Sequence, residues 1–261
     1  VDNAPIKHNG FSLTNVEKQI HYTSPGYELQ QTIHNGVLYI KPEIVGGGAI
    51  VEPGQPYLPT ITTYYAVEPG KTFSVQAVIE ETQIHEDVDL LPFDSWENES
   101  DGSTEEGNVY FQNQVFPENI ATVSAPIVFR DITMVQVSIT PFQYNPVTKT
   151  LVAIQDMDIE LIENGETQEI PFIPQKRSRE FEKLYESLII NYSSLSRDNI
   201  EYQRPSILYV LPNNIGNLFG TVEQLMDWKK RVGYDVQFVS SSNVVNNRNN
   251  LKNYIDDAYE N

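Results

Sequence analysis

The sequence contains no cysteine among its 261 residues. A chain of this composition forms no disulfide, holds no metal through a thiolate and offers no cysteine nucleophile. It also lacks an apolar run close to the roughly 20 residues that a membrane-spanning helix needs. No basic segment followed by an apolar core stands at Val1, so we expect any signal peptide to have been removed before this numbering begins.

Positive charge is scarce as well. The chain carries 17 Lys and Arg against 36 Asp and Glu, which gives a formal net charge of −19. Contacts with nucleic-acid phosphates or with anionic membrane surfaces need clustered Lys and Arg, so this charge argues against both kinds of partner. The simplest role of such acidity is solubility.

Strand-like sequence is abundant in the first two thirds of the chain. From Phe11 to Ile170, segments rich in Val, Ile, Thr and aromatic residues alternate with turn signals, as in "KTFSVQAVIEE" and "ITMVQVSITPFQY". The stretch "YNPVTKTLVAI" predicts a hairpin at Asn145-Pro146, and "ELIENGETQEI" predicts another with Asn164-Gly165 as a type I′ turn. Short strands at this spacing predict that residues 1–174 form an antiparallel β-sandwich.

The pattern changes after Pro174. The segment "SREFEKLYESLIINY" places apolar residues on one helical stripe between Phe181 and Ile189, and Ser178 is suited to cap the start of that helix. We interpret residues 175–204 as a helical linker.

Residues 205–261 have the order strand, helix, strand and helix. "SILYVL" is a continuous apolar run, as in buried parallel strands. Thr221 and Gln224 have the spacing of a capping box at the start of a helix, and Gly233 is suited to end that helix. "YDVQFVS" and "NLKNYIDDAYE" predict a second strand and a second helix. This order predicts the beginning of an α/β domain with a parallel sheet.

The same stretches carry a resemblance to a known family. "PSILYVLPNNIGN", "VEQLMDWKKRVGYDVQFVSS" and "LKNYIDDAYEN" resemble the opening of the peptidase domain of gingipain-type cysteine peptidases, family C25. Upstream, "PGQPYLPTITTYYAVEPGKTFSVQAV" and "FRDITMVQVSITPFQYNPVTKTLVAIQDMDIEL" resemble two parts of the propeptide of that family. The resemblance runs from about Gly54 to Asn261, with the propeptide motifs before the peptidase motifs.

The resemblance implies the zymogen of a cysteine endopeptidase that is secreted or held at a bacterial cell surface. A β-sandwich prodomain would act as a folding aid and would cover the active site of its own caspase-like α/β peptidase domain until proteolysis removes it. In this family a His–Cys pair cleaves protein or peptide substrates, and both residues lie beyond the positions reached here. The chain has no cysteine, and its last histidine is His85, so we assign no catalytic residue to it.

A propeptide that inhibits like a substrate places one side chain in the specificity pocket of the enzyme. Between Lys71 and Arg130 there are twelve Asp and Glu and no Lys or Arg. Within this stretch, the long polar segment from Asp94 to Asn119 is either a solvated loop or the inhibitory loop. The candidate inhibitory residues are Asn113, Asn119 and Arg130. A loop position favours the asparagines, whereas Arg130 suits a basic-specific enzyme but sits at the edge of a strand-like run.

The same polar segment contains a weak calcium-binding pattern. Glu97, Glu99 and Asp101 are spaced as in an EF-hand loop, with Gly102 at the sixth position. Asn108 stands where a bidentate Glu is needed. We therefore expect no required cofactor and keep calcium as an alternative.

Basic residues gather at the junction of the two halves. Exposed junctions are preferred sites of proteolytic processing. The candidate processing sites are Lys176, Arg177 and Arg179 at the junction, and Arg197 and Arg204 in the polar connector that follows.

The sequence leaves one alternative function open. A β-sandwich can also serve as a non-catalytic binding module, such as an adhesin domain, with an α/β fragment attached to it.

Overall fold

The computed structural model of the chain describes residues 6–8, 11–16, 19–34, 36–50, 52–93, 106–166, 177–195 and 201–260. The chain divides into two compact units. Unit 1 comprises Val1–Gln175 and Lys183–Ser196, and unit 2 comprises Lys176–Glu182 and Arg197–Asn261.

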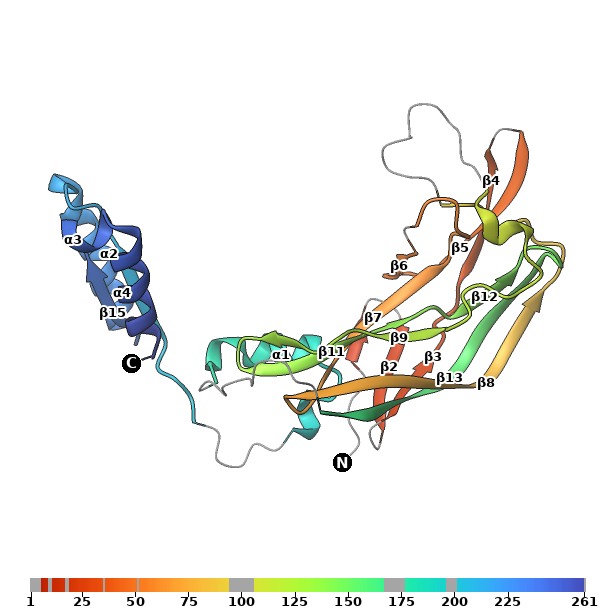
Figure 1. Ribbon diagram of the computed structural model, residues 1–261, viewed down its shortest axis with the longest axis horizontal. Helices are drawn as coiled ribbons and strands as arrows, with labels where there is room; N and C mark the ends of the chain where they lie inside the picture. Colours follow the sequence, from red (N-terminus) through yellow and green to blue (C-terminus); the bar gives the residue numbers. More distant parts are fainter. Residues whose placement is uncertain are drawn as a thin grey trace. The chain divides into compact units, whose positions relative to one another are not determined.

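The larger sheet of unit 1 has six strands, and every pairing in it is antiparallel (Figure 1). Its strands are β1 (Ile6–His8), β2 (Phe11–Val16), β3 (Gln19–Thr23), β13 (Thr150–Glu166), β12 (Phe142–Asn145) and β8 (Lys71–His85). The long strand β13 organises this sheet. It pairs with β8 along one edge, and with β12 and then β3 along the other.

The second sheet of unit 1 has five strands and is also antiparallel. Its strands are β6 (Gly48–Ala49), β7 (Pro59–Ala66), β9 (Ala121–Val123), β10 (Ile127–Phe129) and β11 (Ile132–Ile139). Strand β11 is central: β7 pairs with one edge, and the short strands β10 and β9 share the other. A separate hairpin is formed by β4 (Glu28–His34) and β5 (Val37–Glu43).

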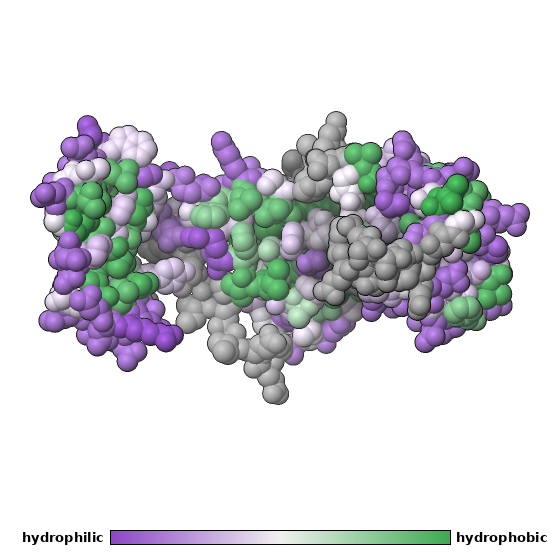
Figure 2. Space-filling model, turned by 90° about the horizontal axis from the view of Figure 1, so that it is seen from above, coloured by the Kyte–Doolittle hydropathy of each residue, from purple (hydrophilic) through white to green (hydrophobic). Residues whose placement is uncertain are grey.

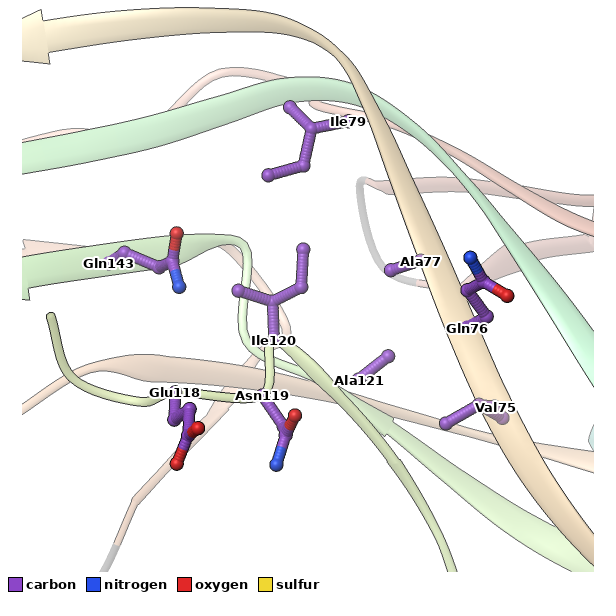
Figure 3. Close-up of a pocket in the computed structure, with 9 residues that line it drawn as sticks. All are labelled: Val75, Gln76, Ala77, Ile79, Glu118, Asn119, Ile120, Ala121 and Gln143. Carbon is purple, nitrogen blue, oxygen red and sulfur yellow. The ribbon is translucent and has the colours of Figure 1, made fainter.

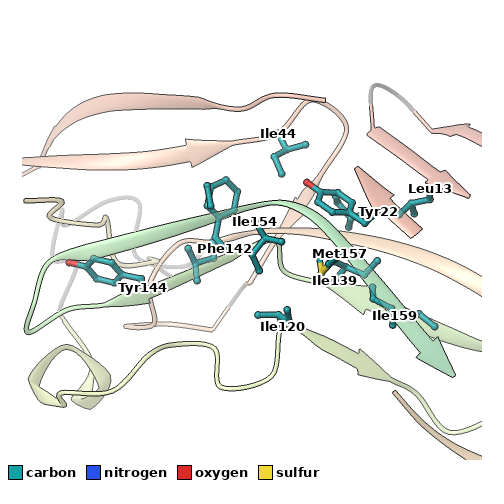
Figure 4. Close-up of a cluster of buried hydrophobic side chains, with 14 of the residues drawn as sticks. Leu13, Tyr22, Ile44, Ile120, Ile139, Phe142, Tyr144, Ile154, Met157 and Ile159 are labelled. Carbon is teal, nitrogen blue, oxygen red and sulfur yellow. The ribbon is translucent and has the colours of Figure 1, made fainter. Parts of the chain in front are cut away.

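The two sheets share one hydrophobic core, part of which is shown in Figure 4. Tyr22 and Met157 contribute fully buried side chains from the six-stranded sheet, and Val137 and Ile139 contribute them from the five-stranded sheet. Burial alternates along β3 and along the middle of β13, as expected when one face of a strand packs on the core. The prediction of a strand-rich antiparallel architecture is confirmed.

The two predicted hairpins have different outcomes. Strands β12 and β13 form the hairpin at Asn145-Pro146, with Asn145 opposite Thr150, so that prediction is confirmed. The turn predicted at Asn164-Gly165 is wrong, because β13 continues through it and stays paired with β8. A register shift between Glu163 and Gly165 marks a β-bulge there, and the φ of +121° at Gly165 is a bulge conformation suited to glycine.

A helical segment follows the junction, and its residues from Lys183 onward belong to unit 1. The helix predicted from Ser178 onward is shorter than its apolar stripe, consisting of the 3₁₀ turn η2 (Arg179–Phe181) and α1 (Glu182–Leu188). The 3₁₀ turn η3 (Tyr192–Ser194) follows. Ser178 precedes the first turn, but its side chain makes no capping hydrogen bond.

Unit 2 contains a two-stranded parallel sheet, formed by β14 (Ser206–Val210) and β15 (Asp235–Val239). The 3₁₀ turn η4 (Gly216–Leu218) leads into α2 (Phe219–Arg231), which connects the strands, and α3 (Ser242–Val245) and α4 (Arg248–Glu260) follow. The parallel pairing and the order of elements agree with the sequence prediction.

Of the two ends predicted for α2, one is wrong and the other is confirmed. The helix begins at Phe219, two residues before Thr221, so the predicted capping-box start is wrong. Its end is as predicted: Gly233 has a φ of +102°, and its N–H donates to the Lys230 carbonyl at 3.0 Å. Among the described residues, no helix is long and apolar enough to cross a membrane.

Large apolar side chains of unit 2 remain exposed. Leu218 is 68% exposed and Phe238 is 46% exposed, although Phe238 lies in β15. Figure 2 shows a band of hydrophobic surface on this unit, bordered by hydrophilic side chains.

Candidate functional site

Arg130 lies in the tight turn between β10 and β11. Phe129 pairs with Ile132, which leaves only Arg130 and Asp131 to form the turn. Arg130 is exposed and has a φ of +58°. Positive φ is uncommon for a long side chain, and such strain often occurs at functional positions. The sequence placed Arg130 at the edge of a strand-like run, whereas the structure places it in the turn.

The turn rests on a buried tyrosine. The Tyr185 hydroxyl of α1 donates a hydrogen bond to Asp131 Oδ1, and the Tyr185 ring packs edge-on against Phe129 with centroids 6.0 Å apart. Burial raises the pKa of Tyr185 above its ordinary value, and the hydrogen bond to Asp131 raises it further. The nearby charge of Arg130 acts in the opposite direction on this pKa. Tyr185 therefore remains a neutral hydrogen-bond donor at physiological pH.

Asn113 lies in the other half of unit 1. It follows the 3₁₀ turn η1 (Asn108–Phe111), and its Oδ1 accepts a hydrogen bond from Asn145 Nδ2 at 3.0 Å. Asn145 is the last residue of β12 and adjoins the β12–β13 turn, which lies at the opposite end of unit 1 from the β10–β11 turn in Figure 1. The structure therefore does not bring Asn113 and Arg130 together.

Asn119 lines a surface cavity of about 340 Å³. One side of the cavity is formed by Val75, Gln76, Ala77 and Ile79 of β8, and the other by Glu118–Ala121 with Gln143 (Figure 3). Figure 3 shows the Asn119 and Ile120 side chains pointing in opposite directions. The exposed amide of Asn119 is available to a partner, but it does not project from a tight turn as Arg130 does.

The processing candidates differ in accessibility. The Arg177 N–H donates to the Glu201 carbonyl at 3.1 Å, and the Arg177 carbonyl accepts from the Gln203 N–H at 2.9 Å. The Arg179 guanidinium lies 4.9 Å from the centre of the Tyr202 ring. Arg204 is exposed and lies two residues before the start of β14. Lys176 and Arg197 lie outside the described residues.

The calcium pattern falls in a part of the chain that is not described. Glu97, Glu99 and Asp101 lie outside the described residues, so that site stays a prediction. Elsewhere, within the described ranges, no three His, Asp or Glu side chains are grouped so that they could hold a metal ion.

Sequence reasoning missed Tyr185 and Asp131. The two residues are 54 positions apart, and neither belongs to a motif that links them. The only available signal was the apolar stripe of the helix, which predicted that Tyr185 is buried.

Comparisons with known proteins cover most of the chain. A model of the C25 propeptide family (Propeptide_C25) matches residues 15–200. Gingipain R2 of Porphyromonas gingivalis is 26% identical over 227 residues, which are 84% of this chain and 31% of that protein. Gingipain R1 of the same organism is 24% identical over 225 residues, 84% of this chain and 22% of that protein. The chain thus spans about a third or less of the length of these relatives.

A solved structure shares the fold. It is the complex of Porphyromonas gingivalis RgpB pro- and mature domains. The match has a TM-score of 0.60 and 26% sequence identity, and it covers 71% of this chain and 98% of that chain.

Proposed function

The chain belongs to the C25 propeptide family and carries the propeptide of a gingipain-type zymogen, and we propose that it silences its own peptidase by occluding the active site. The solved structure with the same fold is a complex of pro- and mature domains, which supports the peptidase domain as the partner. The family match favours this function over the alternative of a non-catalytic adhesin module.

We propose the domain division 1–174 for the propeptide, 175–204 for the linker and processing region, and 205–261 for the first part of an α/β cysteine peptidase domain. The parallel β14–β15 pair with its connecting helix supports the last assignment. The exposed apolar side chains of unit 2 support it too, because surfaces of this kind are covered by further elements in a complete domain. The remainder of the peptidase domain would supply that cover.

The observation that carries the inhibitory mechanism is the position of Arg130. A substrate-like inhibitor must project one side chain from a rigid support. Arg130 is exposed in a two-residue turn and has a strained φ of +58°. Asn113 is engaged with Asn145, and Asn119 lines a cavity. We therefore assign Arg130 as the residue that enters the specificity pocket, and with it a preference of the mature enzyme for basic residues.

Alanine substitutions test this assignment. The inhibition constant of the chain against the mature peptidase is measured for Arg130→Ala, Asn113→Ala and Asn119→Ala. Loss of a desolvated anchor should cost at least about 2 kcal/mol, roughly thirtyfold in affinity. We expect this loss for Arg130→Ala alone. A larger loss with either asparagine variant would transfer the role to that residue, and no loss in any variant would refute substrate-like occlusion.

A zymogen of this kind also implies a cellular location, a class of substrate and a site of maturation. We propose that the protein is secreted or held at the bacterial cell surface, and that the mature enzyme cleaves proteins or peptides. Processing by a basic-specific enzyme would use Lys176, Arg177, Arg179, Arg197 or Arg204. We propose that the chain requires no cofactor, with calcium at Glu97, Glu99 and Asp101 as the alternative. Under that alternative, removal of calcium by a chelator lowers the thermal stability of the chain.

A further inference from the structure

The β10–β11 turn receives little support from its own hairpin. Strand β10 has only three residues and lies at the edge of its sheet. Ile127 is 40% exposed and Val128 is 56% exposed, so most of this strand does not pack on the core. A strained turn persists only where surrounding structure fixes it. The support for Arg130 must therefore come from outside the hairpin.

Tyr185 of α1 supports the β10–β11 turn through two contacts. Its side chain is fully buried, its hydroxyl donates to Asp131 Oδ1, and its ring contacts Phe129 at the other end of the turn. The second carboxylate oxygen, Asp131 Oδ2, is buried and has no hydrogen-bond partner among the described residues. Loss of the Tyr185 hydroxyl would therefore leave a poorly satisfied carboxylate next to Arg130.

Tyr185 is itself held firmly in unit 1. Its ring lies 5.6 Å from that of Tyr192, centroid to centroid. The Asn191 side chain bonds both backbone groups of Ala66, accepting from the N–H at 2.8 Å and donating to the carbonyl at 2.9 Å. The Ile190 N–H donates to the Tyr64 carbonyl at 2.9 Å. The segment Lys183–Leu195 is thus built into the five-stranded sheet through β7.

We propose that Asp131 and Tyr185 are positioning residues for Arg130, and that one segment within the proposed linker region, Lys183–Leu195, is an integral part of the inhibitor, in agreement with its place in unit 1. This inference rests on the proposed function of Arg130. The segment, which we call the brace, fixes the direction in which the Arg130 side chain leaves the turn. It acts through Arg130 and makes no contact with the peptidase in this role.

Whether the propeptide still inhibits after the maturation cut depends on which side of the brace the cut falls. A cut at Arg177 or Arg179 precedes the brace and leaves it attached to the peptidase. Separation of the two products would then withdraw Tyr185 from Asp131 and end inhibition. A cut at Arg197 or Arg204 follows the brace, and the released propeptide keeps an intact inhibitory turn. The pairing of Arg177 with residues 201–203 disfavours the early cut, because proteases act on accessible, flexible backbone.

The test uses four variants of the full 261-residue chain: Tyr185→Phe, Arg130→Ala, the double variant, and Tyr22→Phe. The last removes a buried hydroxyl from the other sheet and serves as the matched control. Inhibition constants are measured against the mature peptidase domain of the same protein with a fluorogenic peptide ending in arginine, together with thermal unfolding. We expect about tenfold weaker inhibition by Tyr185→Phe and no change with Tyr22→Phe. In the Arg130→Ala background, Tyr185→Phe should have no further effect.

The outcomes distinguish the proposed role of Arg130 from the positioning role of Tyr185. If Arg130→Ala inhibits as well as the parent chain, the proposed role of Arg130 fails and the brace fails with it. If Arg130→Ala weakens inhibition and Tyr185→Phe does not, only the positioning role is overturned. If Tyr185→Phe weakens inhibition equally with and without Arg130, its effect is purely structural, which also overturns the positioning role.

Discussion

The two units of the chain contain similar kinds of side chain but use them differently. In unit 1, large side chains such as Tyr22, Phe142 and Val137 are buried in a core that both sheets share. In the described part of unit 2 after residue 204, the buried apolar residues are Leu211, Met226 and Val239. Unit 1 therefore has the packing of a self-sufficient domain. Unit 2 has regular helices and strands, but many of its large apolar side chains, such as Leu218 and Phe238, are exposed.

The strongest test of this comparison is to separate the units. A fragment of residues 205–261 should lack a cooperative unfolding transition, because its parallel sheet has only two strands and its apolar surface is bare. Circular dichroism during urea titration and analytical ultracentrifugation provide the measurement. A monomeric fragment with a sharp transition would show that unit 2 is self-sufficient after all.

Matched truncations of phenylalanine in the two units should differ by several kcal/mol. Phe142 is 1% exposed and packs in the core of unit 1, so Phe142→Ala should lower the free energy of unfolding by about 3–5 kcal/mol. Phe238 in β15 is 46% exposed, and Phe238→Ala should cost about 1 kcal/mol or less. Denaturant unfolding of the full chain checks both values. Equal losses would contradict the contrast in packing.

Glycine-to-alanine changes should have opposite signs in the two units. A Cβ at Gly107 would lie 2.7 Å from the Gly54 carbonyl oxygen, so Gly107→Ala should destabilise unit 1 by about 1–3 kcal/mol. A Cβ at Gly220 in α2 meets nothing within 4 Å. Gly220→Ala should therefore raise the stability or helix content of unit 2 by up to about 1 kcal/mol. Thermal melts followed at the helix signal distinguish the two effects.

The smallest expected effect is the alkaline sensitivity of the unit 1 core. Burial raises the pKa of Tyr22 from 10.0 to about 12. The folded state therefore favours the neutral phenol of Tyr22. The contribution of this phenol to the free energy of unfolding is complete below pH 10 and is lost as the pH rises toward 12. We expect about 1 kcal/mol of loss from Tyr22 by pH 11. Unfolding free energies measured between pH 9 and 11 should fall less steeply in Tyr22→Phe than in the parent chain.

Local signals in the sequence predicted local structure well. Asn145-Pro146 specified a hairpin and Gly233 specified the end of a helix, because each needs only neighbouring residues. Asn164-Gly165 carried an equally strong turn signal, yet pairing with β8 converted it into a bulge. Long-range pairing overrode local preference at this position.

The candidate site was harder to predict than the fold. The turn at Arg130-Asp131 contains one residue that favours turns, Asp131, and lacks the glycine, asparagine or proline of a stronger turn signal. Its support comes from Tyr185, which a sequence of this kind cannot connect to Asp131 over 54 positions. Sequence reasoning therefore identified Arg130 as a candidate but misjudged how it is presented.

Strand β13 also sets the timing of events during synthesis of the protein. His21 of β3 contacts Asp158 of β13, and these residues are separated by 137 positions. At ribosomal rates of about 5–20 residues per second, β3 is made roughly 7–27 seconds before β13, the neighbour that lies on the opposite edge from β2. Throughout that interval β3 has only the earlier strands β1 and β2 beside it, and the apolar side chains of Ile20 and Tyr22 lack the core that β13 helps to form. Chaperones that protect newly made strands should therefore associate with the early N-terminal segment and leave when β13 arrives.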